Sequence, residues 1–287
     1  MENRFSYEGK RVVVTGAASG MGEAAAEVVG SLGAEVVALD LRPPSVDCAS
    51  HLEVDLRDQA AMDEAVATIA EGGPVNALFS CAGLPGQTDF AGSDVMLVNF
   101  LAMRHLAESV LPLMGPGDAI ALVSSAAGIW YRDNAATIDD LLGNDDYESA
   151  KQWILDHPDE VAEGYVLSKM ATIVWTMRRA VSLTADTGVR LNCISPGPTR
   201  TGMLPHFVRA QGQEFMDGFP KPLGRYSESD EQAWPLAFLC SDAASYVSGV
   251  NLYTDGGFAG GYETGEITIE DMLPPEMAQA VLGGDDG

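Results

Sequence analysis

Two tyrosine–lysine pairs, each four positions apart, carry the side chains of this sequence that are best suited to proton transfer. Tyr147 and Lys151 form the first pair, and Tyr165 and Lys169 form the second. On a helix this spacing places both side chains on one face, where the ammonium can lower the pKa of the phenol. Such a phenol can act as a general acid or base. Because the spacing is common by chance, the rest of the chain has to distinguish the two pairs.

The elements that must position these residues follow from the apolar pattern. Short apolar runs alternate with longer segments of helical period, which is typical of a parallel sheet with helices on both faces. We expect strands at residues 11–16, 34–40, 75–83, 118–125, 189–197 and 249–257. We expect helices at residues 20–33, 58–71, 94–114, 164–186 and 228–242. The sequence therefore predicts an α/β fold, a doubly wound parallel sheet, in a single domain over residues 1–287.

Composition narrows the possible partners. The 287 residues carry a formal charge of −26, and no apolar run is long enough to cross a membrane. The negative charge argues against binding of nucleic acid or of anionic membranes. The four cysteines and four histidines are scattered, so we expect reduced thiols and no metal site. The start lacks the apolar core of a signal peptide, which favours a cytoplasmic protein.

A glycine-rich turn follows the first expected strand. The segment TGAASGMG contains Gly16, Gly20 and Gly22, and it opens the first expected helix. Glycines here let the backbone approach a pyrophosphate, which then lies at the N-terminus of that helix. Eighteen residues beyond Gly22, the second strand ends at Asp40, whose carboxylate can bind both ribose hydroxyls and repel a 2′-phosphate. We therefore expect NAD rather than NADP, although the nearby Arg42 opposes that preference.

These motifs, with several that follow in order, resemble the classical short-chain dehydrogenase/reductase family. The turn matches the family's TGxxxGxG pattern, and SCAG at residues 80–83 stands where the family has NNAG, so a serine and a cysteine replace two asparagines. The segments EVDLRD, MLVNF, LVSSAAG, ISPGPTRT and DGG also match, so the resemblance covers about residues 9–258. It implies a Rossmann-like fold and a homodimer or homotetramer.

The resemblance and the spacing together favour the second tyrosine–lysine pair. Lys169 lies 23 residues before Asn192, which leaves room for one long helix and a short turn before the fifth strand. The first pair would instead need a helix through HPDEVAEG, and Pro158 and Gly164 argue against one. We therefore expect Tyr165 and Lys169 to carry the chemistry, and the first pair to be a surface coincidence.

The resemblance also implies a role for each member of a catalytic tetrad. Tyr165 would move a proton to or from the substrate oxygen, and Lys169, with the oxidised nicotinamide, would lower the pKa of that phenol. Ser125 would hydrogen-bond the substrate oxygen, and Asn99 would hold a water that links Lys169 to solvent. Besides Tyr165 and Lys169, the residues that it places at the cofactor are Gly16, Ser19, Gly20, Met21, Gly22, Asp40, Asp55, Leu56, Cys81, Ala82, Gly83, Pro196, Gly197, Thr199 and Thr201.

Residues 126–164 form an insertion between the catalytic serine and tyrosine, and its apolar pattern predicts two short amphipathic helices. An insertion here resembles the family branch that contains 3α-hydroxysteroid dehydrogenase/carbonyl reductases and coniferyl-alcohol dehydrogenases. One interpretation is a cap over the nicotinamide end, with Trp130 or Trp153 near the substrate. The other is a segment that packs on a neighbouring subunit.

The expected substrate loop spans residues 198–225, and a Gly-rich acidic tail spans residues 260–287. Apolar side chains that either line a pocket or pack as core are Ile129, Trp130, Met203, Leu204, Phe207, Phe215, Met216 and Phe219. Without an Arg or Lys cluster for a phosphorylated substrate, we expect a neutral apolar alcohol or ketone, such as a steroid, a terpenoid or an aryl alcohol. The leading hypothesis is an NAD-dependent alcohol dehydrogenase or carbonyl reductase. The alternative is a dinucleotide-sensing regulatory protein on the same fold.

Overall fold

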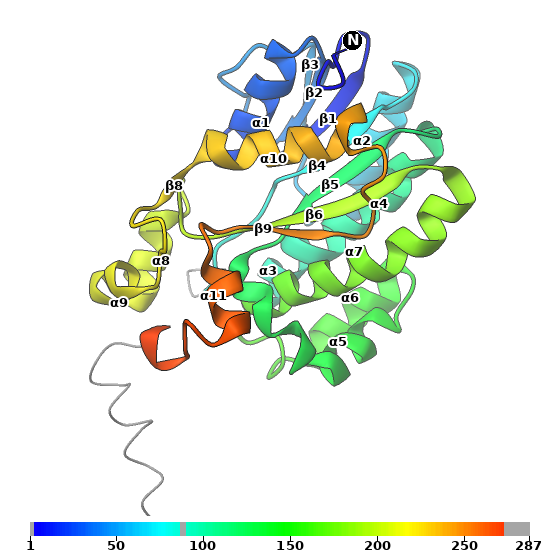
Figure 1. Ribbon diagram of the computed structural model, residues 1–287. Helices are drawn as coiled ribbons and strands as arrows, with labels where there is room; N and C mark the ends of the chain where they lie inside the picture. Colours follow the sequence, from blue (N-terminus) through cyan, green and yellow to red (C-terminus); the bar gives the residue numbers. More distant parts are fainter. Residues whose placement is uncertain (1–2, 87–89, 273–287) are drawn as a thin grey trace, which may run out of the picture.

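A parallel sheet of seven strands forms the centre of the computed structural model, which describes residues 3–86 and 90–272 (Figure 1). The strand order is β3-β2-β1-β4-β5-β6-β9, and all neighbours are parallel. The strands are β1 Arg11–Thr15, β2 Glu35–Asp40, β3 Ser50–Glu53, β4 Ala77–Ser80, β5 Ala119–Val123, β6 Arg190–Pro196 and β9 Asn251–Thr254. The order reverses between β1 and β4, which makes this the expected doubly wound, Rossmann-like sheet.

The sequence predicts six of these strands and misses β3. This strand has the sequence SHLE, pairs with β2 and lies at the edge of the sheet. Its two end residues are exposed and its two central ones are partly buried, so it carries no apolar run. By contrast, β4, β5 and β6 are buried at every position, which explains their continuous apolar sequences.

Helices cover both faces of the sheet (Figure 1). Helices α1 and α10 pack together on one face, and α2, α4 and α7 cover the other. These helices are α1 Gly20–Ser31, α2 Gln59–Glu71, α4 Met103–Val110, α7 Tyr165–Thr187 and α10 Ser229–Cys240. Their buried side chains form one apolar cluster against each face of the sheet, and the two clusters hold the strand ends in fixed positions.

The long helix expected at residues 94–114 is present, but it is not regular. It consists of α3 (Gly92–Met96), the π-helical turn η1 (Leu97–Ala102), α4 and the 3-10 turn η2 (Leu111–Leu113). A π-helical turn accommodates one extra residue, and such turns are frequent at functional sites. Asn99 lies inside η1, so the irregular turn contains a predicted catalytic residue.

The insertion contains the two expected helices. They are α5 (Ala135–Leu142) and α6 (Tyr147–Asp156), and they follow the 3-10 segment η3 (Ala126–Arg132). In Figure 1 they lie beside α7, away from the end of β9, where α8, α9 and α11 lie. Their apolar faces, with Ile138 and Leu141 fully buried, belong to the apolar cluster that contains α7.

Three expectations for this region are corrected. Trp153 faces the core and not the reaction site, since its Nε1 donates to Asp140 Oδ2 at 2.6 Å and its ring stacks on His157. Helices α5 and α6 therefore extend the core and do not form a cap, because their apolar faces are used against α7 and η1. Tyr147 is likewise not a surface residue, because it is buried in the same cluster with Lys151 Nζ 6.0 Å from its ring centroid.

Short elements surround the carboxyl ends of the central strands. The expected substrate loop forms α8 and α9, and the start of the expected tail forms α11 and η5, whereas residues 273–287 lie outside the described residues. The bounds of the short elements are β7 Thr199–Arg200, α8 Leu204–Gln211, α9 Gln213–Gly218, β8 Ser227–Glu228, η4 Asp242–Ala244, α11 Phe258–Thr264 and η5 Glu270–Met272. The tail thus contributes ordered structure at the edge where ligands bind in folds of this kind.

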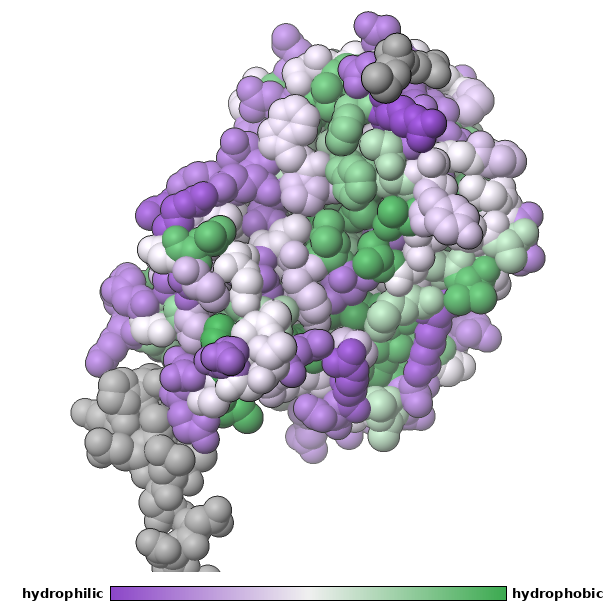
Figure 2. Space-filling view, in the orientation of Figure 1, coloured by the Kyte–Doolittle hydropathy of each residue, from purple (hydrophilic) through white to green (hydrophobic). Residues whose placement is uncertain are grey.

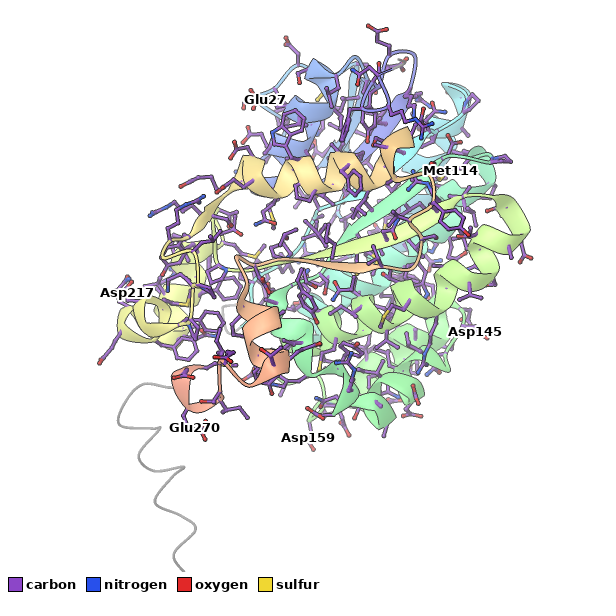
Figure 3. The ribbon with its side chains drawn as sticks, viewed as in Figure 1. Glu27, Met114, Asp145, Asp159, Asp217 and Glu270 are labelled. Atoms are coloured by element: carbon purple, nitrogen blue, oxygen red, sulfur yellow. The ribbon has the colours of Figure 1, made fainter. Side chains whose placement is uncertain are left out.

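The surface is mainly hydrophilic, with apolar residues in a central band of the face seen in Figure 2. The acidic side chains labelled in Figure 3, such as Glu27, Asp145, Asp159 and Asp217, point outwards from the periphery. Within residues 3–86 and 90–272, no helix is long and apolar enough to cross a membrane, and no three His, Cys, Asp or Glu side chains are grouped as metal ligands.

Candidate active site

The second tyrosine–lysine pair lies at the carboxyl edge of the sheet, beside the end of β5. Tyr165 is the first residue of α7, and Lys169 follows one turn later. Lys169 Nζ lies 5.6 Å from the centroid of the Tyr165 ring and donates a 2.9 Å hydrogen bond to the Val123 carbonyl oxygen. Ser125, two residues beyond Val123, accepts a hydrogen bond from the Ala127 N–H through its Oγ at 3.1 Å, and its hydroxyl lies near enough to the Tyr165 phenol to lower the pKa of that phenol. The end of one strand and the start of one helix thus bring three predicted catalytic residues together.

The two tyrosine–lysine pairs lie on different helices, as the breaker residues predict. Helix α6 ends at Asp156, before Pro158, and α7 begins directly after Gly164. The first hydrogen bond of α7 runs from the Ser168 N–H to the Gly164 carbonyl oxygen at 2.9 Å. The Ser168 hydroxyl also donates to the Tyr165 carbonyl oxygen at 2.6 Å, and these bonds fix the first turn of α7.

Burial disfavours the charged form of both the phenol and the ammonium. It lowers the pKa of Lys169 to about 8, against the opposing effect of Cys81 and Cys193. It raises the pKa of the Tyr165 phenol, against the opposing effect of the hydrogen bond with Ser125. In the protein alone, removal from water has the larger effect on the phenol. The expected lowering of its pKa by Lys169 together with the oxidised nicotinamide stays a prediction.

Asn99 braces the loop that follows β4. Its Oδ1 accepts from the Leu84 N–H at 2.6 Å, and its Nδ2 donates to the Leu84 carbonyl oxygen at 2.9 Å. The side chain is 2% exposed, so these two bonds satisfy an amide that would otherwise be costly to bury. An amide group can form further hydrogen bonds, and the expected water link from Asn99 to Lys169 stays a prediction.

The glycine turn is built for close backbone approach. Gly16 has φ of +71°, and a Cβ there would lie 2.8 Å from the Ala82 backbone. A Cβ at Gly22 would overlap the carbonyl group of Gly16, so the start of α1 can pack against the turn only without a side chain. Thr15 Oγ1 accepts from the N–H groups of Cys81 at 3.1 Å and Ala82 at 3.2 Å. This hydroxyl braces the SCAG segment, in which the family's two asparagines are absent.

Asp40 ends β2 beside the glycine turn, as the sequence predicts. Its Oδ2 accepts from the Ala18 N–H at 3.1 Å, and its Oδ1 accepts from the Arg42 N–H at 3.0 Å. The carboxylate therefore points toward the turn, and Arg42 contributes its backbone to this contact. Asp55 lies near the next strand end and forms an ion pair with Arg57 at 2.6 Å, whose hydrogen bond lowers the pKa of Asp55.

A cavity of about 420 Å³ opens between the glycine turn and the segment after β6. Gly20 lies on one side of it, and Arg200, Thr201 and Leu204 lie on the other. Arg200 pairs with Glu228 at 3.1 Å, and it places a positive charge across the cavity from the helix N-terminus of α1. Sequence reasoning missed Arg200, although it stands between two predicted cofactor residues in ISPGPTRT.

The segment from Pro196 to Thr201 runs along the end of the sheet. Thr199 Oγ1 donates to the Gly197 carbonyl oxygen at 2.9 Å, and Thr201 Oγ1 accepts from the Met203 N–H at 3.2 Å. Among the other predicted cofactor residues, Ser19 immediately precedes α1, Gly83 follows β4, and Met21 and Leu56 pack against the two apolar clusters. Their contact with a cofactor stays a prediction.

One aromatic side chain contacts the Tyr165 ring, and several others pack in a third apolar cluster that begins directly after Ser125. Phe207 of α8 meets the Tyr165 ring edge-on, with centroids 5.2 Å apart. Phe219 and Phe258 lie 4.9 Å apart, and Trp130 Nε1 donates to Tyr262 Oη at 2.9 Å. The sequence leaves open whether Phe207, Phe219 and Trp130 line a pocket or pack as core, and the structure packs Phe219 and Trp130 in the third apolar cluster. The sequence misses the two α11 residues. A signal for them was available, since Phe258 and Tyr262 stand four apart directly after the DGG motif.

Comparison with known proteins agrees with this geometry. Residues 10–136 match the family model described as short chain dehydrogenase, and residues 158–259 match the one described as enoyl-(acyl carrier protein) reductase. The chain is 33% identical to coniferyl-alcohol dehydrogenase of Pseudomonas sp. (strain HR199 / DSM 7063), over 88% of this chain and 98% of that protein. It is also 33% identical to 3-alpha-hydroxysteroid dehydrogenase/carbonyl reductase of Comamonas testosteroni, over 86% of this chain and 95% of that protein.

Solved structures give the same result. The 3-alpha-hydroxysteroid dehydrogenase of Pseudomonas sp. B-0831, complexed with NADH, superposes with a TM-score of 0.76 at 27% identity, over 90% of this chain and 100% of that one. A putative 2-deoxy-d-gluconate 3-dehydrogenase of Agrobacterium tumefaciens with bound NADP has a TM-score of 0.68 at 23% identity, over 90% and 100%, and shows the fold alone. With the ordered motifs, the sheet topology and relatives matched over almost their whole length, the chain belongs to the short-chain dehydrogenase/reductase family.

Proposed function

We propose that this protein is an NAD-dependent oxidoreductase that interconverts a neutral, apolar secondary or aryl alcohol and its carbonyl compound. The observation that carries the proposal is the meeting of Tyr165, Ser125 and Lys169 at one edge of the sheet. Membership of the short-chain dehydrogenase/reductase family gives the reaction class, because its members are oxidoreductases. A protein that only senses a dinucleotide would not need a serine and a tyrosine side by side next to a buried lysine.

The residues around the glycine turn fit a dinucleotide. A side chain at Gly22 would overlap the Gly16 carbonyl group, so the first turn of α1 packs directly on the glycine turn, and the neighbouring cavity is lined by Gly20 and Thr201. A pyrophosphate would lie at that N-terminus, opposite Arg200. Pro196, Gly197 and Thr199 would hold the nicotinamide end. When bound, NAD supplies the hydride acceptor, and NADH supplies the hydride donor.

The chain's own residues would then handle the proton. The Ser125 hydroxyl would hydrogen-bond the substrate oxygen, and Tyr165 would give a proton to that oxygen or take one from it. Lys169 would stabilise the phenolate while its Nζ stays anchored on the Val123 carbonyl oxygen. The aromatic wall around Phe207 would exclude water from the oxygen on which the proton moves.

Asp40 supports NAD as the preferred cofactor. Its carboxylate lies at the end of β2, where it can accept hydrogen bonds from ribose hydroxyls and repel a 2′-phosphate. Arg42 is exposed, and its backbone N–H already donates to Asp40. The NADH complex of the similar hydroxysteroid dehydrogenase agrees with this preference.

The aromatic side chains near Tyr165 support an apolar substrate without a phosphate group. Phe207 meets the Tyr165 ring edge-on, and Phe219 and Trp130 belong to the apolar cluster that begins directly after Ser125. The two relatives at 33% identity are named for coniferyl alcohol and for a 3-alpha-hydroxysteroid, which both present a hydroxyl group on an apolar body. We include a homodimer or homotetramer in the cytoplasm in this proposal, and the four free thiols agree with a reducing compartment.

A substrate screen tests the proposal. The purified protein is incubated with NAD or NADP and with sterols, terpenols or cinnamyl alcohols, and reduced cofactor is followed by its absorbance. We expect turnover with at least one class, faster with NAD, and a loss of nearly all of it in the Tyr165→Phe variant. Binding of NADH without turnover of any alcohol or ketone would instead favour the dinucleotide sensor.

A further inference from the structure

Gln232 is a polar side chain on the buried face of α10. It is 1% exposed, and the residues that share this buried face are apolar, among them Ala233 and Leu236. Burying an amide is costly unless its polar atoms find partners, whereas an apolar side chain of the same size would pack at this position without that cost. The partners of its hydrogen bonds therefore indicate what a polar side chain at this position contributes.

The amide nitrogen of Gln232 bonds to two neighbouring segments at once. Its Nε2 donates to Ser227 Oγ at 2.9 Å and to the Thr254 carbonyl oxygen at 3.0 Å. Ser227 belongs to β8, and Thr254 ends β9. One side chain on α10 therefore connects the short strand β8 to the carboxyl end of β9 in the main sheet.

Both bonds lead on to the segment from Pro196 to Thr201. Ser227 Oγ lies 2.8 Å from Thr199 Oγ1, which donates to the Gly197 carbonyl oxygen at 2.9 Å. The Thr254 carbonyl oxygen accepts a second hydrogen bond from the Gly197 N–H at 3.3 Å. Two chains of hydrogen bonds that start at the Gln232 amide nitrogen thus end at Gly197. One ends at its carbonyl oxygen and the other at its N–H group.

The orientation of this amide follows from its partners. A carbonyl oxygen can only accept, so the nitrogen of Gln232 must face Thr254, and Oε1 must point the other way. Within the described residues, Oε1 and Thr254 Oγ1 have no hydrogen-bond partner in the protein, and both residues line a cavity of about 190 Å³. The two bonds of the nitrogen thus fix the orientation of the amide, with Oε1 on the side away from Thr254.

We propose that Gln232 is a positioning residue, which holds the Pro196–Thr201 segment in the geometry that hydride transfer requires. The inference rests on the proposed function, in which this segment holds the nicotinamide end of the cofactor. A shift of about 1 Å in such a segment can reduce the rate of the chemical step by roughly 100-fold. The adenosine end is held elsewhere, at the glycine turn and Asp40, so affinity for the cofactor depends less on Gln232.

Two variants test this role. Gln232→Met keeps the size of the side chain and removes both donors, and Gln232→Glu keeps the shape and turns a carboxylate toward the Thr254 carbonyl oxygen. Gln152→Met is the matched control, because the exposed Gln152 also donates from Nε2 to a neighbouring oxygen, that of Asp156. Ser227→Ala is a milder variant that cuts one route only, and it serves if both Gln232 variants fail to fold.

Two measurements separate this inference from the proposed function. In the cofactor-free protein, amide hydrogen exchange of residues 196–201 should be faster in the Gln232 and Ser227 variants than in the control. In a single turnover, hydride transfer should slow by roughly 10- to 100-fold in the Gln232 variants, while the dissociation constant for NADH changes much less. Unchanged exchange and unchanged hydride transfer in folded variants would overturn the role of Gln232. Failure of the unmodified protein to bind NADH would overturn the proposed function, and the exchange measurement would still decide whether Gln232 holds the segment.

Discussion

At the reaction site, burial moves the pKa values of the phenol and the ammonium in opposite directions. The pKa of Tyr165 is raised and that of Lys169 falls to about 8, so both shifts favour the neutral forms. Lys169 keeps its place through the Val123 carbonyl oxygen, which binds the ammonium and the neutral amine alike as a hydrogen-bond acceptor. We infer that the charged forms depend on what binds beside them, so proton transfer is coupled to occupation of the site.

The first prediction at this scale separates the two tyrosines. Tyr165→Phe removes the proton-transfer group and should lower turnover by roughly 10²- to 10⁴-fold while NADH still binds. Tyr147→Phe should keep most of the activity, because the Tyr147 hydroxyl is buried without a hydrogen-bond partner among the described residues. Steady-state rates and NADH fluorescence measure both effects. A larger loss in the Tyr147 variant would contradict the assignment.

A second prediction concerns the effect of Lys169 on stability. Between pH 8 and 10.5 the unfolded chain binds more protons at this position than the folded protein, because the pKa falls from 10.5 to about 8 on folding. The stabilising contribution is therefore complete above pH 10.5 and is lost as the pH falls to about 8. Relative to Lys169→Met, the free energy of unfolding should rise by about 3 kcal/mol over this range. Denaturant titrations of both proteins measure the difference, and a flat difference would show that the ammonium is well solvated.

The third prediction tests the choice of cofactor. Asp40→Ala should lower kcat/KM with NAD by roughly 10- to 100-fold, because hydrogen bonds to a charged group are lost. It should also improve the use of NADP relative to NAD, since the repulsion of a 2′-phosphate is removed. Asp47→Ala, an exposed acidic position nearby, is the control. Equal use of NAD and NADP by the unmodified protein would contradict this interpretation.

The sequence predicts the residues of the candidate site well when a short stretch of the chain contains the whole pattern. The spacing of Tyr165 and Lys169, together with the breakers before them, distinguishes the correct pair. It does not give the direction of the phenol's pKa shift, because that depends on burial by segments distant in the chain. Gln232 is missed for the same reason, since its partners Ser227 and Thr254 meet it only in the folded sheet.

At the scale of elements, periodic segments are predicted best and short or irregular ones worst. The 23 residues of α7 give a long helical pattern, and β5 gives an unbroken apolar run. The edge strand β3 has no such run, and the π-helical turn η1 has the composition of an ordinary helix. Its extra residue is decided by packing around Asn99 and not by local preference.

The tail helix α11 provides a prediction at this scale. It joins the segment after Ser125 through the bond from Trp130 Nε1 to Tyr262 Oη and an ion pair between Arg132 and Glu263 at 3.1 Å. Tyr262→Phe removes the acceptor of this partly buried bond and should raise the KM for an apolar alcohol by about 5-fold, with little change in the KM for NAD. Tyr246→Phe, fully exposed, is the control. Equal effects on both Michaelis constants would contradict a role for α11 in the substrate wall.

For the whole molecule, the sheet separates two large apolar clusters, and α5 and α6 of the insertion belong to the larger one, whereas Ala126 and Ile129 at its start belong to a third, small cluster with Phe258. Helices α5 and α6 pack against α7 and η1, the two elements that carry Tyr165, Lys169 and Asn99. The sequence predicts both helices but not the face that they cover. The insertion begins and ends at the catalytic edge, and this connectivity favours a cap. In the structure, however, the apolar faces of α5 and α6 pack against the side of α7 and η1. Burial of those faces decides the arrangement, since it removes more apolar surface from water than a hinged cap would.

Matched leucines in the insertion test this arrangement. Leu141 of α5 is fully buried, whereas Leu155 of α6 is 51% exposed. Leu141→Ala leaves a cavity beside α7 and should lower the free energy of unfolding by about 2–5 kcal/mol. Leu155→Ala should change it by less than about 0.5 kcal/mol. Neither change should alter the KM for a bulky alcohol while the protein is folded, because neither side chain faces the substrate. A several-fold rise of that KM in folded Leu141→Ala, without a loss of stability, would restore the cap and remove α5 from the core.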